Sequence, residues 1–123
     1  MQKIHTDSAP KALGPYSQGY VSNGLVFTAG QIGINPETGD VDADDIETQA
    51  EQACKNIGEI LKAAGSSYDK VLKTTCFLTD LADFNVFNGI YAKYFTSAPA
   101  RSCVQVAALP KGVKCELEAV AAL

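Results

Sequence analysis

The sequence predicts an α+β fold, a two-layer sandwich in which two helices pack on one face of a mixed β-sheet. Strand-like segments gather at the two ends of the chain and helical patterns lie between them, in the order ββ, α, β, α, ββ. A further strand at the amino end would fit the same pattern. At 123 residues, with 46% hydrophobic and 20% charged side chains, the chain has the size and composition of one globular domain spanning residues 1–123.

A hairpin near the amino end is the clearest local signal. Residues 18–22 and 25–29 read as two short strands, and Asn23-Gly24 between them tolerates the positive φ of a tight turn. A loop over residues 35–39, which contains proline and glycine, then leads to the first helix.

The first helix is expected to begin near Asp44, whose side chain would cap the amino end while Glu47, three residues on, completes a capping box. Gly65 is a natural stop. Apolar residues recur between these points at intervals of three and four and form one stripe that must face a sheet or a helix: Ile46, Ala50, Ala53, Ile57, Ile60, Leu61 and Ala64.

A β-branched run over residues 71–78 predicts the next strand, and Asp80 is placed to cap a second helix over residues 81–95. Aromatic residues follow one side of that helix, and Asn88 falls beside them. A buried amide needs partners, so Asn88 is either a structural link between backbone groups or a ligand contact.

Two strands, 101–107 and 113–121, are expected to close the chain. Two helices cover only one face of a small sheet, and the other face would carry apolar, threonine and cysteine side chains. Burial against another subunit suits that face better than exposure to water. We therefore expect association.

Composition disfavours several functions. A formal charge of -4 argues against binding a phosphate backbone, so nucleic acid is a disfavoured partner. No stretch is apolar enough for a signal peptide or a membrane span, which predicts a cytoplasmic protein. The four cysteines match no zinc or thioredoxin spacing, and the single histidine, His5, cannot supply a catalytic triad or a multi-histidine metal site. We expect neither metal nor cofactor.

Arg101 is the only arginine among ten basic residues, and it stands at the start of an expected strand. A guanidinium offers what lysine cannot, a planar and permanently charged fork that grips a carboxylate through two hydrogen bonds. A lone arginine is nevertheless more often a surface ion-pair residue, and Glu116 and Glu118 could be solvated edge charges. Cys103 has no histidine partner, which disfavours a nucleophilic role.

Geometry bears on the pairing of Arg101 with Glu116. If residues 110 and 111 form a two-residue turn, Gln105 pairs with Glu116, and Glu116 shares the face of Arg101. Arg101 then lies four residues from Gln105 along the strand, roughly 13 Å away. One chain could not easily hold a small molecule between the two groups, so we expect the arginine of one protomer to meet the glutamate of the next.

Several motifs together resemble the RidA/YjgF family of reactive-intermediate deaminases, over nearly the whole chain from about residue 9 to 121. They are Gly14-Pro15-Tyr16-Ser17-Gln18, Thr28-Ala29-Gly30-Gln31, Asn88, Pro99-Ala100-Arg101-Ser102-Cys103-Val104 and Glu116-Leu117-Glu118-Ala119. The resemblance implies a homotrimer of chorismate-mutase-like subunits with clefts between neighbours. It also implies hydrolysis of 2-aminoacrylate and related enamines or imines to 2-keto acids and ammonia.

The resemblance also assigns roles to residues. Arg101 would bind the substrate carboxylate and Glu116 would position the water. The remaining residues would line the cleft: Tyr16, Gly30, Asn88 and Cys103, the last largely through its backbone. The chain departs from many such deaminases at Ala29, where they have serine, and in a short segment over residues 96–98. Two other functions stay open, namely a trimer that senses a keto acid without turnover and, third, an endoribonuclease.

Overall fold

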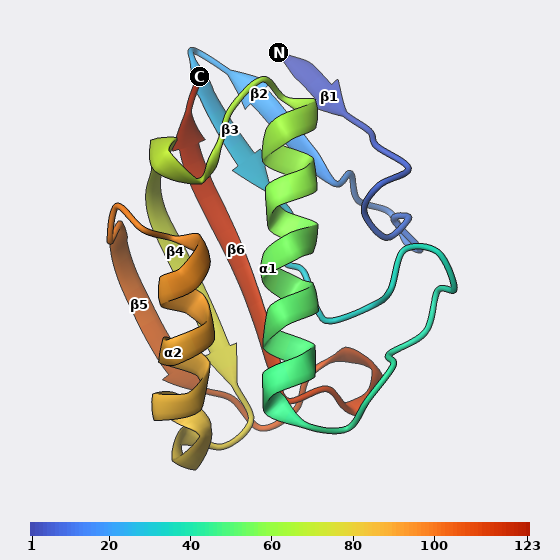
Figure 1. Cartoon of the computed structure of the whole chain (residues 1–123). Coiled ribbons are helices and arrows are strands. Elements are labelled where there is room, and N and C mark those ends of the chain that lie inside the picture. Colours follow the sequence, from blue (N-terminus) through green and yellow to red (C-terminus); the bar gives the residue numbers. More distant parts are fainter.

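Six strands form one mixed sheet with two helices packed against it, as Figure 1 shows for the computed structural model of residues 1–123. The elements in chain order are β1 (Gln2–Ile4), β2 (Gly19–Ser22), β3 (Leu25–Thr28), α1 (Ile46–Ala63), β4 (Val71–Leu78), α2 (Phe84–Tyr94), β5 (Ala100–Gln105) and β6 (Cys115–Ala122), with short 3-10 turns η1 (Tyr68–Lys70), η2 (Leu81–Asp83) and η3 (Pro110–Gly112). The spatial order of the strands is β1-β2-β3-β6-β4-β5. This arrangement confirms the expected fold class, including the extra strand at the amino end.

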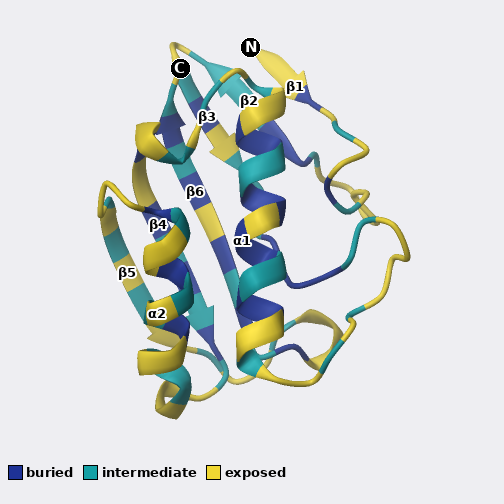
Figure 2. Ribbon diagram, in the orientation of Figure 1, coloured by how far each residue is buried: buried dark blue, intermediate teal, exposed yellow.

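Both helices lie on the same face of the sheet (Figure 1). The buried side of each helix faces the strands, and exposed residues mark the outer side (Figure 2). The core between the layers includes Ile57 and Leu61 from α1, Phe87 from α2 and Leu117 from β6, all fully buried. The apolar stripe expected for the first helix therefore packs as predicted.

The ends of α1 follow local chemistry. Its amino-terminal cap is Asp45 and not Asp44 as predicted, because the Asp45 carboxylate accepts the backbone N–H of Thr48, three residues on, at 2.8 Å. At the carboxyl end Gly65 takes a positive φ of 86°, and the N–H of Ser66 donates to the carbonyl of Leu61. The predicted glycine stop is confirmed.

The predicted hairpin between the last two strands is wrong. Strand β4 lies between β5 and β6, pairing in parallel with β5 and antiparallel with β6. The segment β4-α2-β5 is thus a parallel crossover unit, in which the helix returns the chain so that β5 can run beside β4. Pro110–Gly112 forms a 3-10 turn inside a longer connection and not a two-residue loop.

The register of β4 also corrects the expected face of Glu116. Cys76 pairs with Cys103 and with Leu117, which places all three side chains on the face that the helices cover. Arg101 is two residues before Cys103 and shares that face, whereas Glu116, next to Leu117, points to the opposite one. The prediction that Glu116 shares the face of Arg101 is therefore wrong.

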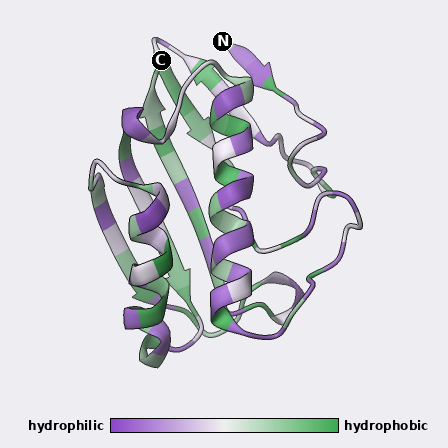
Figure 3. Ribbon diagram, viewed as in Figure 1, coloured by the Kyte–Doolittle hydropathy of each residue, from purple (hydrophilic) through white to green (hydrophobic).

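No helix covers the second face of the sheet (Figure 1). Among its apolar side chains, Phe27 and Val104 are each 43% exposed. Figure 3 shows hydrophobic residues along the strands of the sheet. This surface fits the expected association, because apolar area of this kind is stabilised by burial.

Neither helix combines the length and the apolar character that crossing a membrane requires.

Candidate functional site

Arg101 lies on β5, the edge strand of the sheet, and its side chain reaches toward α2. Its Nη1 donates a hydrogen bond to Oδ1 of Asn88 at 2.8 Å. The guanidinium carbon also lies 4.8 Å from the ring centroid of Tyr91 and 5.5 Å from that of Phe84. These contacts are within the range of cation–π attraction, so one amide and two rings hold the charged group.

Arg101 has no acidic partner within the chain. The two ion pairs of the structure join Lys93 to Glu51 and His5 to Asp7. The interpretation of Arg101 as a surface ion-pair residue therefore does not hold for this chain. Because the bond to Asn88 uses one of five guanidinium N–H groups, the others remain able to bind an external anion.

Asn88 has the role of a partner to the arginine. Its amide oxygen accepts from Arg101, so the interpretation of Asn88 as a link between backbone groups is wrong, whereas a contact with a ligand stays a prediction. The contacts with Phe84 and Tyr91 were not predicted. A signal was present, because residues 84, 88 and 91 follow the i, i+4, i+7 spacing of one helix face.

Glu116, Gly30 and Tyr16 come together at a hollow of about 180 Å³. Its wall also includes Leu13 and Lys111, which the sequence did not indicate. Glu116 packs directly over Gly30, since a Cβ at position 30 would lie 2.9 Å from Oε1 of Glu116. Glycine is therefore required here for the close approach of the carboxylate.

The carboxylate of Glu116 is half-buried and forms no ion pair. Burial, with a smaller contribution from the negative charge of Glu118, raises the pKa of Glu116 above its ordinary value. A carboxylate with a raised pKa is a stronger base than one in water. Such a group can accept a proton from a water molecule or orient it.

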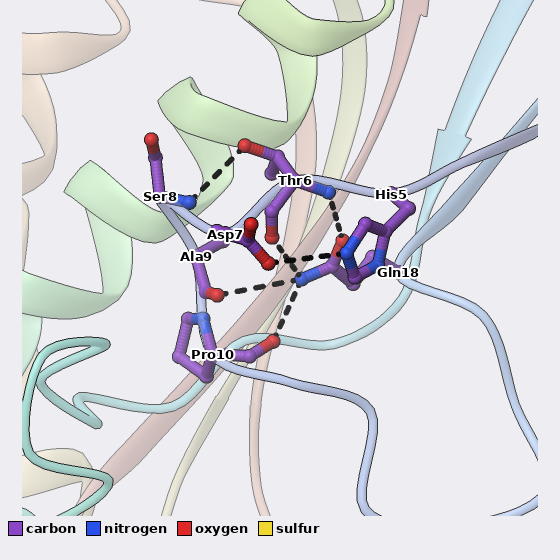
Figure 4. Close-up of polar contacts among 7 residues, drawn as sticks. All are labelled: His5, Thr6, Asp7, Ser8, Ala9, Pro10 and Gln18. Carbon is purple, nitrogen blue, oxygen red and sulfur yellow. Dashed lines mark hydrogen bonds and ion pairs between the residues drawn. The ribbon is translucent and has the colours of Figure 1, made fainter.

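A side-chain amide fixes the segment that forms one wall of this hollow. Gln18 accepts the backbone N–H of Thr6 at 2.7 Å and donates to the carbonyls of Thr6 at 3.0 Å and Pro10 at 2.8 Å (Figure 4). These bonds hold residues 6–10 beside Gln18, which directly precedes β2, and Leu13 and Tyr16 between them line the hollow. The role of Gln18 is structural, and the sequence motif that contains it did not reveal this.

Cys103 lies beside Cys76 on the helix-covered face and near the arginine. Burial raises the pKa of the Cys103 thiol, and the positive charge of Arg101 opposes this only partly. The group is therefore a poor nucleophile at neutral pH, in agreement with the sequence interpretation. No three His, Cys, Asp or Glu side chains are grouped where they could hold a metal ion.

The candidate residues thus form two separate groups within one chain. Asn88 and Cys103 accompany Arg101 at the helix-covered side of the edge strand, while Tyr16 and Gly30 accompany Glu116 on the other side of the sheet. Two strand spacings and three residues of rise separate Arg101 from Glu116, which is roughly 14 Å between their Cα atoms. One small molecule cannot contact both groups of the same chain.

The fold and these two groups describe an α+β protein with an arginine that lacks an acidic partner at a sheet edge and a half-buried carboxylate beside a glycine. Comparison with known proteins then identifies the family. The family described as endoribonuclease L-PSP matches residues 6–123. The chain belongs to this family, which is the RidA/YjgF family that the motifs resemble.

Three relatives illustrate the similarity. The chain is 54% identical over 121 residues to reactive intermediate deaminase A, chloroplastic, of Arabidopsis thaliana, covering 98% of this chain and 65% of that protein. It is 50% identical over 119 residues to the Homo sapiens protein named 2-iminobutanoate/2-iminopropanoate deaminase, and the match covers 96% of this chain and 87% of the human protein. The crystal structure of Escherichia coli TdcF with bound serine superposes with a TM-score of 0.95 at 45% identity, and the match covers 100% of this chain and 99% of the TdcF chain.

Proposed function

We propose that this protein hydrolyses 2-aminoacrylate-type enamines and imines to 2-keto acids and ammonia, in clefts between the subunits of a homotrimer. The main observation behind this proposal is the environment of Arg101, the only arginine of the chain. Asn88 and two aromatic rings hold its guanidinium in place, and no acidic side chain of the chain pairs with it. Such a group suits the carboxylate of a small 2-imino acid. The names of the human and Arabidopsis relatives and the serine bound to TdcF support the same class of substrate.

The reaction needs little chemical assistance. The imine carbon is already electrophilic, so the protein has to fix the carboxylate, orient water and move a proton. In the proposed step the water oxygen bonds to C2 of the imine while Glu116 accepts a proton from that water. That proton passes to the imine nitrogen, which gives a carbinolamine. A second transfer, from the C2 hydroxyl to the amino group, lets the C–N bond break as the C2=O bond forms, which releases ammonia and leaves the keto acid. No covalent intermediate with the protein is required.

The separation of the two groups supports a site between subunits. Arg101 of one protomer and Glu116 of its neighbour could meet if the open face and the edge strand of the sheet were covered in an oligomer. Tyr16 and Gly30 would then line the same cleft from the side of Glu116, and Asn88 and Cys103 from the side of Arg101. The apolar character of the open face is consistent with such contacts.

The test generates 2-iminopropanoate or 2-iminobutanoate in place with a dehydratase and follows the decay of the intermediate. Wild type should accelerate this decay, and Arg101→Ala and Glu116→Ala should not. Loss of the charge-assisted contact in Arg101→Ala should reduce kcat/KM by about 30- to 1000-fold, equivalent to about 2 to 4 kcal/mol. Equal decay with and without wild type would refute the proposal.

A mixing experiment tests the shared cleft. Arg101→Ala and Glu116→Ala are purified separately, unfolded together in equal amounts and refolded. If each cleft takes its arginine and its glutamate from different chains, about one quarter of the clefts regain both groups. Activity near that fraction supports the proposal, whereas activity that stays at the level of the single variants argues for clefts within one chain.

Two other functions have specific support. The bound serine of TdcF fits a trimer that senses a small carboxylate without turnover, and tight keto-acid binding without accelerated decay would favour it. The family description names an endoribonuclease. The net charge of -4 and the single arginine disfavour RNA binding, and only ribonuclease activity that survives both Arg101→Ala and rigorous purification would favour that function.

A further inference from the structure

Tyr91 occupies a special position under the guanidinium of Arg101. Its ring centroid is 4.8 Å from the guanidinium carbon, which is closer than that of Phe84 at 5.5 Å. On its other sides Tyr91 stacks on Phe95 at 4.4 Å and contacts Phe87 at 6.0 Å. Tyr91 is only 7% exposed, so the ring has little freedom to move away from the arginine.

The hydroxyl of Tyr91 is also fixed. It shares a hydrogen bond of 2.7 Å with the hydroxyl of Thr74, which is fully buried. Thr74 is in turn the β4 residue that pairs with Arg101 across the parallel ladder. The three residues therefore form a closed circuit, in which the backbone joins Thr74 to Arg101, hydroxyls join Thr74 to Tyr91, and the ring contacts the guanidinium.

We propose that Tyr91, held by Thr74, is a positioning residue that orients the guanidinium of Arg101 toward the substrate carboxylate, a role that rests on the proposed imine hydrolysis. An arginine side chain has many rotamers, and a bidentate grip requires one orientation of its plane. The bond to Asn88 fixes one nitrogen, and the Tyr91 ring fixes the plane. Less conformational freedom is then lost when substrate binds.

The pair of buried hydroxyls points to orientation more than to packing. Phenylalanine and valine at positions 91 and 74 would occupy almost the same space without burying two polar groups in an apolar core. The hydroxyl bond adds direction to the ring, since it determines which edge of Tyr91 faces β4. Polar networks of this kind specify one arrangement of a core when every member has a partner, as both hydroxyls do here.

The test uses the fact that the chain has one arginine, so its Nε–H gives a single side-chain NMR signal. In wild type we expect a restrained signal on the picosecond-to-nanosecond timescale, shifted by the Tyr91 ring current. Tyr91→Leu should make the signal mobile and remove the shift, whereas Tyr91→Phe should keep most of both. Tyr94→Leu is the matched control, because Tyr94 is a tyrosine of the same helix whose ring packs on Tyr68 and not on Arg101.

Kinetics on the dehydratase-generated imine give the second readout. Tyr91→Leu should raise KM about 10-fold with kcat changed less, and Tyr91→Phe should recover KM to within about threefold of wild type. Tyr94→Leu should lower the melting temperature but leave KM within about twofold. A restrained arginine and a wild-type KM in Tyr91→Leu would overturn the inference, as would an equal rise of KM in Tyr94→Leu.

The two proposals fail in different ways. If wild type does not accelerate imine decay, the proposed function fails, yet the NMR signal still reports whether Tyr91 holds Arg101. If wild type is active and Tyr91→Leu leaves both the arginine signal and KM unchanged, the positioning role alone is wrong. Where Tyr91→Leu does not fold, Tyr91→Met replaces it, because it also removes the ring over Arg101, and an unchanged arginine signal and KM in that variant would also count against the role.

Discussion

Gly30→Ala should damage the proposed chemistry without damaging the fold. The new Cβ would lie 2.9 Å from Oε1, 3.0 Å from Cδ and 3.3 Å from Cγ of Glu116. Non-bonded heavy atoms prefer about 3.5 Å or more, so the carboxylate would have to move by about 0.6 Å. Gly30 is not among the glycines with positive φ, so alanine is compatible with the backbone at this position and the effect is purely one of space.

The size of the effect follows from the displacement. A shift of about 1 Å in a reacting group can cost 10²-fold in rate, so we expect Gly30→Ala to lower kcat by about 10- to 100-fold, or about 1.4 to 2.7 kcal/mol of transition-state stabilisation. The thermal midpoint should change little, because Glu116 is only half-buried and its side chain can move toward solvent. The assay is the decay of dehydratase-generated 2-iminobutanoate beside a thermal melt.

Gly89→Ala is the matched control. A Cβ at Gly89 would meet no atom within 4 Å, and the residue lies in α2, where alanine favours the helix. This variant should keep wild-type kcat and melt at the same or a higher temperature. If Gly30→Ala keeps wild-type kcat, the carboxylate of Glu116 does not act in the chemistry, or its position does not matter, and the reasoning is refuted.

Two further predictions concern titration and thiol chemistry. The pKa of Glu116 is raised in the folded state. At pH values between the ordinary and the raised pKa, the folded protein therefore binds more protons than the unfolded chain. Glu116 thus lowers the free energy of unfolding as pH rises through that window. Glu116→Gln should therefore be inactive yet at least as stable as wild type at pH 7 by urea unfolding, and a clear loss of stability would contradict the raised pKa. Cys103→Ala should keep kcat/KM within about threefold of wild type. In wild type a thiol reagent should modify Cys103 before the buried Cys76 and Cys115, because burial raises the pKa values of those two thiols to about 12. A 100-fold loss of activity, or prior labelling of a buried thiol, would show that this assignment is wrong.

The sequence determined most of the local structure. The Asn23-Gly24 turn, the α1 stripe and the Gly65 stop depend on spacings of a few residues, and the structure confirms them. Asp44 and Asp45 are adjacent and chemically equivalent, so the choice of cap depended on which carboxylate reaches the N–H of Thr48. Strand pairing was harder to predict, because nothing local in β5 and β6 indicates that β4 separates them.

The site was predictable as a set of residues and not as an arrangement. The uniqueness of Arg101 and the motifs around Gly30 and Glu116 identified the candidates. The error in pairing then placed Glu116 on the face of Arg101, since one wrong neighbour changes which face a side chain occupies. The contact with Tyr91 depends on how α2 packs over β5, which is a tertiary feature.

The placement of Arg101 and Glu116 on opposite faces has a consequence for regulation by protein concentration. In the proposed arrangement a dissociated chain carries every functional group and still has no complete site. Turnover per chain should fall steeply once the protein is diluted below its assembly constant, whereas the fold of each chain could persist. A cell could then silence such an enzyme by keeping protomers apart, without touching any residue that contacts substrate.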